Sequence, residues 1–435
     1  MRISLLILLT GLPVFPLLGQ APAAPAPPAS SGSETVARPG TIFESPQNWP
    51  STAFLPGANI PGNGWQINGT VHNDGLYNTW GVSSQYGPYQ ITGNERLLQL
   101  LREIEATQKL NAMSKTKEFG EAMKKAGIAQ LQSAKRVLSD PVDTVSKIPE
   151  GASRFFGRVG NTVKHTVQGN LDIDQDATPE EKARKLFGVD KAKRQLAAQL
   201  GVSPWTSNAA LQKALNDVAS VQAAGTLTMD IGKSLVVPPV LGGVMTGINV
   251  TNSLTQEQIA ASPKDLTKQN RAKAVSLGVP GETADAFAAN VFYDPWDQTF
   301  FWNTLAQLPG LNATIFVEKA ASASSPLDAF FFLRTAQLMA LYHQRVAPLQ
   351  EMVALPHTVA CVQTDGALMV PLWVDYAIWT PQAEAAAKNL QQLAEQRQAS
   401  QTFVVTTGYF SQQATQELKA RGIETVPHVL APSPK

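Results

Sequence analysis

The residues best placed to contact a ligand lie near the C-terminal end of the chain. Trp373 and Asp375 are separated by one residue, and Tyr376 and Trp379 follow within a stretch that has the composition of a β-strand. Successive side chains of a strand point to opposite faces, so Trp373 and Asp375 are expected on one face. Open α/β sheets bind ligands at the carboxyl ends of their strands. We therefore predict a binding site formed by Trp373, Asp375, Tyr376 and Trp379, with a packed sheet face as the alternative.

Two other patterns approach a known ligand site but lack a required residue. Gly232-Lys233-Ser234 is like the end of a phosphate-binding loop, but a leucine stands five residues earlier, where that loop needs glycine. The alternating aspartates of residues 172–176 are like the start of a calcium loop, but the glycine and glutamate of such a loop are replaced by alanines. We therefore expect no metal site and no cofactor.

Residues that could catalyse a reaction are dispersed along the chain. No two histidines have the spacing that puts two metal ligands on one helix face, and there is no Gly-x-Ser-x-Gly motif. The single cysteine, Cys361, can form no internal disulfide and lies in an apolar run typical of a buried, inert thiol. We therefore favour a non-enzymatic protein. An envelope hydrolase with residues from distant segments, and with Asp375 or His357 near its site, is the alternative.

The N-terminal end has the layout of a cleavable export signal. Residues 1–19 combine Arg2 with an apolar stretch that contains two prolines and is shorter than the ~20 residues of a membrane-spanning helix. Small residues follow, and cleavage is expected after Gly19 or Ala23. Residues 20–40 are rich in Pro, Ala and Ser and predict a disordered linker. We expect a periplasmic or secreted protein with no transmembrane helix in its mature form.

The charge of the chain excludes one class of partner and leaves another open. There are 35 basic and 34 acidic residues, so the chain as a whole is not suited to nucleic acid. Residues 109–165, however, contain 11 Lys or Arg and 5 Asp or Glu. This excess indicates either solvated helix faces or peripheral attachment to an anionic membrane surface.

The pattern of apolar residues predicts a mainly α fold. Residues 41–91 are rich in Gly and aromatic residues and predict an irregular segment with a single hairpin. Helical periodicity begins at Thr92, where Glu95 completes a capping box, and a helical domain is expected over residues 92–350. Its aromatic run at 287–302 is expected in the core.

A small α/β domain is expected over residues 356–430. Asp365-Gly366 predicts a β-hairpin, and helix, strand, helix and strand then follow. A strand–helix–strand unit of this size implies parallel strands. The predicted fold is therefore a large helical domain followed by a small C-terminal unit with a hairpin and an αβαβ series.

Three stretches of the sequence resemble exported bacterial proteins that have no assigned activity. They are residues 140–158, beginning Asp140-Pro141-Val142, residues 200–208 with the sequence LGVSPWTSN, and Thr407-Gly408 with Ser411. The resemblance implies export and a shared fold, and it brings no catalytic residue. Together with the linker, the basic region and the aromatic residues, it favours a protein that binds a protein or another envelope component.

Overall fold

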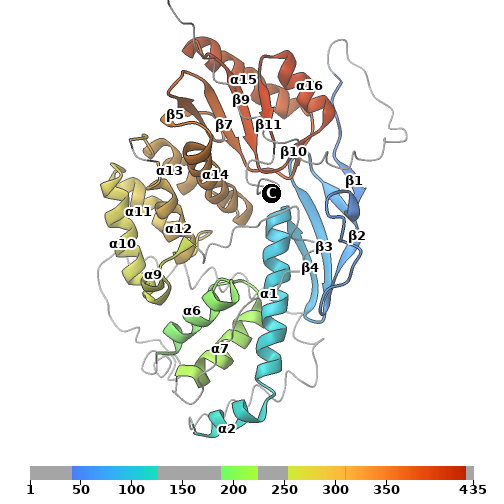
Figure 1. Ribbon diagram of the computed structural model, residues 1–435, viewed down its shortest axis with the longest axis vertical. Helices are drawn as coiled ribbons and strands as arrows, with labels where there is room; N and C mark the ends of the chain where they lie inside the picture. The colour runs from blue at the N-terminus through green and yellow to red at the C-terminus, as the bar shows by residue number, and fades with distance from the viewer. Residues whose placement is uncertain (1–41, 126–187, 224–252, 309, 428–435) are drawn as a thin grey trace, which may run out of the picture.

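The computed structural model describes residues 42–125, 188–223, 253–308 and 310–427. Within them the chain forms an N-terminal antiparallel sheet, a group of helices and a C-terminal mixed sheet (Figure 1). The predicted mainly α fold is therefore wrong, because the protein is mixed α/β. The export signal, the linker, Gly232-Lys233-Ser234, the aspartates of 172–176 and most of the basic region lie outside the described residues.

The segment expected to be irregular forms a complete four-stranded sheet. Its strands follow one another in chain order as β1 (Gln47–Pro50), β2 (Trp65–Asn73), β3 (Asn78–Ser84) and β4 (Gly87–Thr92), all antiparallel. The register of β2 against β3 shifts between Ile67 and Val71. Such an irregularity breaks the two-residue alternation by which β2 would be recognised in the sequence. The expected hairpin is present as β2 and β3, whereas the outer strands β1 and β4 were not expected.

Helix α1 (Asn94–Met113) packs its apolar face on this sheet. Leu97, Leu101 and Ile104 share a buried cluster with Trp80 and other residues of the strands. The predicted capping box at the start of α1 is wrong, because Thr92 ends β4 and the N-cap position is Gly93, which has no side chain to offer. The open backbone N–H groups in the first turn of α1 therefore need a hydrogen-bond acceptor from elsewhere in the chain.

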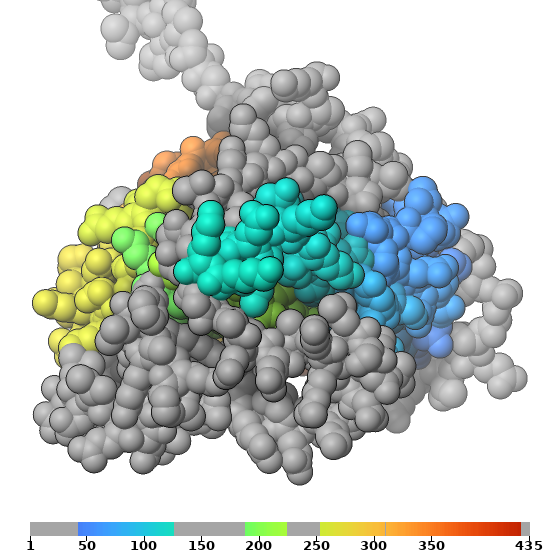
Figure 2. All heavy atoms as spheres, turned by 90° about the horizontal axis from the view of Figure 1, so that it is seen from below, coloured from blue at the N-terminus to red at the C-terminus, as the bar shows by residue number. Residues whose placement is uncertain are grey.

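Four shorter helices complete the lower part of the molecule. They are α2 (Lys117–Lys125), α6 (Val189–Leu200), α7 (Ala209–Ala223) and α9 (Gln256–Ala260), and α7 packs against both α1 and α6. Seen from below, α1 and α2 lie between the N-terminal sheet on one side and the helices that follow α7 on the other (Figure 2). Of the helices in the described ranges, none has the length and apolar character required to cross a membrane.

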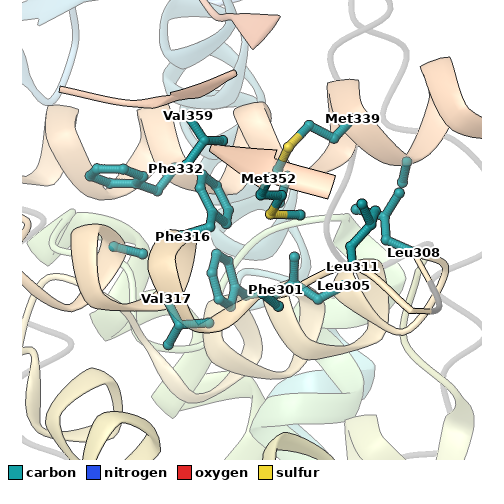
Figure 3. Packing of buried hydrophobic residues seen from close by; sticks show 14 of the residues in the cluster. Phe301, Leu305, Leu308, Leu311, Phe316, Val317, Phe332, Met339, Met352 and Val359 are labelled. Carbon is teal, nitrogen blue, oxygen red and sulfur yellow. The ribbon is translucent and has the colours of Figure 1, made fainter. Parts of the chain in front are cut away.

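The next helices contain the aromatic core expected from the sequence. They are α10 (Pro263–Ser276), α11 (Gly281–Ala289), α12 (Pro295–Leu305), α13 (Thr314–Ala321) and α14 (Pro326–Arg345). Phe287, Phe301 and Phe316 are fully buried, with neighbouring ring centroids 4.5 and 5.7 Å apart. Figure 3 shows this cluster continuing past Phe332 to Met352 of the C-terminal sheet.

The C-terminal sheet has five strands in the order β11-β9-β7-β6-β5. They are β5 (Leu349–Ala354), β6 (Val359–Gln363), β7 (Leu368–Leu372), β9 (Thr402–Thr406) and β11 (Glu424–Val426). The predicted hairpin at Asp365-Gly366 is confirmed, as is the parallel pairing of the later strands. The edge strand β5 was not expected.

Helices cover both faces of this sheet. Residues of α13 and α14 share one buried cluster with β5, β6, β7 and β9, while α15 (Pro381–Arg397) and α16 (Gln412–Ala420) pack on the other face. The last helices of the expected helical domain are thus one layer of an α/β sandwich. This shared core is the second reason why the fold is not mainly α.

Candidate functional site

The stretch that carries the predicted binding site is a loop that crosses between the two sheets. Strand β7 ends at Leu372, and residues 373–379 contain only the two-residue strand β8 (Tyr376–Ala377), which pairs in parallel with β10 (Tyr409–Phe410). The backbone N–H groups of Asp375 and Tyr376 donate to the carbonyl oxygen of Leu76, at 2.9 and 3.2 Å. The loop therefore binds the turn between β2 and β3, and strand alternation does not apply to its side chains.

Asp375 supplies the missing cap of α1. Its carboxylate is buried and accepts the backbone N–H of Asn78 at 2.9 Å. The backbone N–H of Asn94, the first residue of α1, lies 3.0 Å from each carboxylate oxygen. A carboxylate at this position satisfies an open N–H of the first turn and interacts favourably with the helix dipole. Asp375 thus joins the loop, β3 and α1.

The pKa of Asp375 is raised from 3.8 to about 7. Burial is the main cause, and the negative charges of Glu95 and Asp74 add to it, while the two backbone hydrogen bonds act in the opposite direction. Both carboxylate oxygens are occupied by main-chain donors. The arrangement therefore suits Asp375 to positioning the surrounding chain.

Trp373 lies on the inner side of the same junction. Its indole N–H donates to Glu95 at 3.1 Å, and its ring contacts the rings of Tyr77 and Phe330, with centroids 5.0 and 4.9 Å away. The other oxygen of Glu95 forms an ion pair with Arg334 at 2.9 Å, and both side chains are almost completely buried. Trp373 therefore links α1, α14 and the loop.

Tyr376 faces the outside of the junction. Its ring centroid lies 5.6 Å from that of Phe54 and 6.5 Å from that of Trp49, and the latter two are 6.4 Å apart. Tyr409 is the register partner of Tyr376 in the parallel pair of β10 with β8. All four rings are half-buried. We call Trp49, Phe54, Tyr376 and Tyr409 the aromatic patch.

Trp379 points into the C-terminal core instead. Its ring is fully buried, and the guanidinium of Arg421 lies 4.7 Å from the ring centroid. Its backbone N–H donates to the carboxylate of Glu44 at 2.7 Å, and its carbonyl accepts the N–H of Glu44 at 2.7 Å. The hydroxyl of Ser411 donates to the same carboxylate at 2.5 Å. Trp379 thus binds the start of the described chain to the C-terminal sheet.

Residues of the stretches singled out in the sequence have structural roles around this loop and elsewhere. A side chain at Gly408 would place its Cβ 2.2 Å from the carbonyl oxygen of Val374, so only glycine allows the two backbones to lie this close. Ser411 caps α16 by accepting the N–H of Ala414 at 3.0 Å. In the stretch at 200–208, Asn208 accepts the N–H of Leu211 at the start of α7. These motifs have structural roles.

Three acidic side chains with raised pKa were not identified as candidates from the sequence. Asp294 and Asp297 form a capping box at the start of α12, and Ser203 donates to Asp294 at 2.5 Å. Burial raises the pKa of both, and the charge of Asp294 raises that of Asp297 further. Glu103 of α1 is also buried, which raises its pKa to about 7. The capping signal at Asp294 was visible in the sequence, but burial of these groups was not.

The described histidines contact neither a serine nor a carboxylate by any hydrogen bond. Nδ1 of His72 lies 2.9 Å from the amide oxygen of Asn48, and Nδ1 of His343 accepts the backbone N–H of Leu349. His357 is exposed. Nor do the described residues contain a group of three His, Cys, Asp or Glu side chains able to hold a metal ion.

Cys361 has the environment expected of an inert thiol. It is fully buried, with its sulfur 3.5 Å from that of Met339. Burial raises the pKa of the thiol to about 12. The thiolate, which is the reactive form, is therefore disfavoured at neutral pH. The predicted burial of Cys361 is confirmed, and its low reactivity stays a prediction.

Comparison with known proteins adds no relative. The chain matches no family model, no curated protein and no solved structure. The function is therefore inferred from the contacts of the described residues. Of the four residues predicted to bind a ligand, Trp373, Asp375 and Trp379 are buried by contacts with other parts of the chain. Tyr376 is half-buried and belongs to the aromatic patch.

Proposed function

We propose that the protein is exported and acts by binding a protein or another component of the cell envelope through the aromatic patch. One observation supports this most directly: the half-buried rings of Trp49, Phe54 and Tyr376 contact one another where the two sheets meet, and Tyr409 is the register partner of Tyr376 on the adjacent strand. Tyr and Trp are enriched at binding surfaces because their rings offer large contact area at little entropic cost and their polar atoms can still form hydrogen bonds.

The support beneath the patch favours a preorganised binding surface. Trp49 and Phe54 come from the N-terminal sheet and its first turn, whereas Tyr376 and Tyr409 come from the C-terminal half. The loop that carries Tyr376 is held on one side by Asp375. A surface held by such contacts loses little conformational freedom on binding.

An envelope hydrolase centred on Asp375 or His357 has less support. The oxygens of Asp375 accept main-chain N–H groups, and His357 is on the exposed surface without a hydrogen-bonded acid or hydroxyl among the described residues. A nucleophile and its base must lie within hydrogen-bond reach of each other. These placements give binding a better basis than catalysis.

A photocrosslinking experiment in the producing cells tests this proposal. A benzophenone amino acid is placed at Tyr376 in the full chain, and a matched protein carries it at Tyr86, another half-buried tyrosine of the N-terminal sheet. The expected result is an adduct with one envelope component, identified by mass spectrometry, from the position of Tyr376 only. Equal labelling from both positions, or none from either, would contradict the proposal.

A further inference from the structure

The segment before the described chain has the repeat of a polyproline ligand. Pro22, Pro25 and Pro28 recur every three residues, and no charged residue occurs between Gln20 and Ser33. A polyproline II helix has three residues per turn, so these prolines would share one face. Segments of the PxxP type bind to surfaces lined by aromatic rings, as in several peptide-binding domains.

The chain emerges next to the aromatic patch. Ile42, the first described residue, is 54% exposed, and Glu44 is bound through two hydrogen bonds to Trp379, three residues after Tyr376. Glu44 also accepts the hydroxyl of Ser411, the residue directly after β10, which pairs with the strand that contains Tyr376. Trp49 follows Glu44 by five residues. The start of the described chain and the patch are therefore neighbours.

The intervening chain is long enough for the prolines to return to the patch. Pro28 precedes Ile42 by 14 residues, most of them small or polar. A flexible chain of that length spans about 20 Å on average and at most about 46 Å. A ligand tethered in this way has an effective concentration on the order of 1 mM at a nearby site. Even a weak PxxP contact would then be populated.

We infer that residues 22–28 of the mature chain bind the aromatic patch of their own molecule as a polyproline II helix. The proline rings pack against the outer side of the cluster formed by Trp49, Phe54 and Tyr376. The carbonyl groups of such a helix are not internally hydrogen-bonded, so they can accept from the tyrosine hydroxyls and the indole N–H. If the signal is cleaved after Ala23, Pro25 and Pro28 still provide one PxxP unit. This inference rests on the proposed function and specifies proline-rich segments as the ligand class.

Intramolecular crosslinking of the full exported protein tests the inference. A benzophenone amino acid is placed at Ala26, the purified protein is irradiated, and the adducts are mapped by mass spectrometry. The expected adducts lie on the peptides that contain Trp49 and Phe54, or Tyr376 and Tyr409. The P25S/P28S variant should reduce their yield at least about fivefold, and a probe at Ser33 serves as the control. An unchanged urea-unfolding curve of the P25S/P28S variant shows that a loss of folding does not explain the lower yield.

Three results would overturn the inference. They are the absence of adducts from those peptides, a yield that does not respond to P25S/P28S, and adducts that join isotopically labelled to unlabelled copies. If the probe at Tyr376 still captures an envelope component while no such intramolecular adduct forms, the proposed function stands and only this ligand assignment fails.

Discussion

Removal of the Asp375 carboxylate is expected to destabilise the protein strongly. In Asp375→Ala, the buried backbone N–H groups of Asn78 and Asn94 lose their acceptor. Each buried donor left without a partner costs about 1–3 kcal/mol, so the free energy of unfolding should fall by about 2–6 kcal/mol. Asp375→Asn keeps one acceptor oxygen in the same position and should cost about half as much.

The pH dependence of the free energy of unfolding provides a second test of the role of Asp375. The pKa of Asp375 is about 7 in the folded protein and 3.8 as the ordinary value. Between these values the folded state binds more protons than the unfolded state, so this group lowers stability as the pH rises. At about 1.36 kcal/mol for each pH unit between the two pKa values, the loss above pH 7 amounts to roughly 4 kcal/mol. Asp375→Asn lacks this effect, so its deficit relative to the parent protein should shrink from pH 5 to pH 8.

Urea denaturation followed by tryptophan fluorescence measures these differences at both pH values. Asp365→Asn is the control, because Asp365 also accepts a backbone N–H, that of Ala367, but in an exposed turn. Its cost should stay below about 1 kcal/mol. The reasoning is refuted if Asp375→Ala unfolds within about 0.5 kcal/mol of the parent at pH 5, or if the deficit of Asp375→Asn is the same at pH 5 and pH 8.

Three further substitutions or reactions test other parts of the junction and core. Gly408→Ala should lower the melting temperature by more than about 5 °C, because its methyl group would lie 2.2 Å from the Val374 oxygen; an unchanged melting curve would contradict the close approach. Arg334→Met leaves Glu95 buried without its partner and should cost about 3–5 kcal/mol in chemical denaturation, much of it recovered in the double variant with Glu95→Gln. Cys361 should react with a thiol reagent no faster than the protein unfolds, and rapid labelling of the native protein would show that the sulfur is accessible.

Local features of the sequence determined many individual elements. Ser262, Asp294 and Ser325, each followed by proline, cap helices, and such a cap can be read from the sequence because it depends on residues within one turn. Asp365-Gly366 specifies its hairpin for the same reason, with Gly366 at a φ of 83°.

The N-terminal sheet and the roles of the candidate residues were decided by tertiary structure. Strand β2 carries an irregular register, and its identity as a strand depends on its pairing with β1 and β3. The carboxylate of Asp375 caps a helix that begins 281 residues earlier in the chain. The spacing of Trp373, Asp375, Tyr376 and Trp379 carries no information about such partners. Side chains close in sequence were therefore directed to separate surroundings, because burial and hydrogen bonding depend on which distant segments the fold brings together.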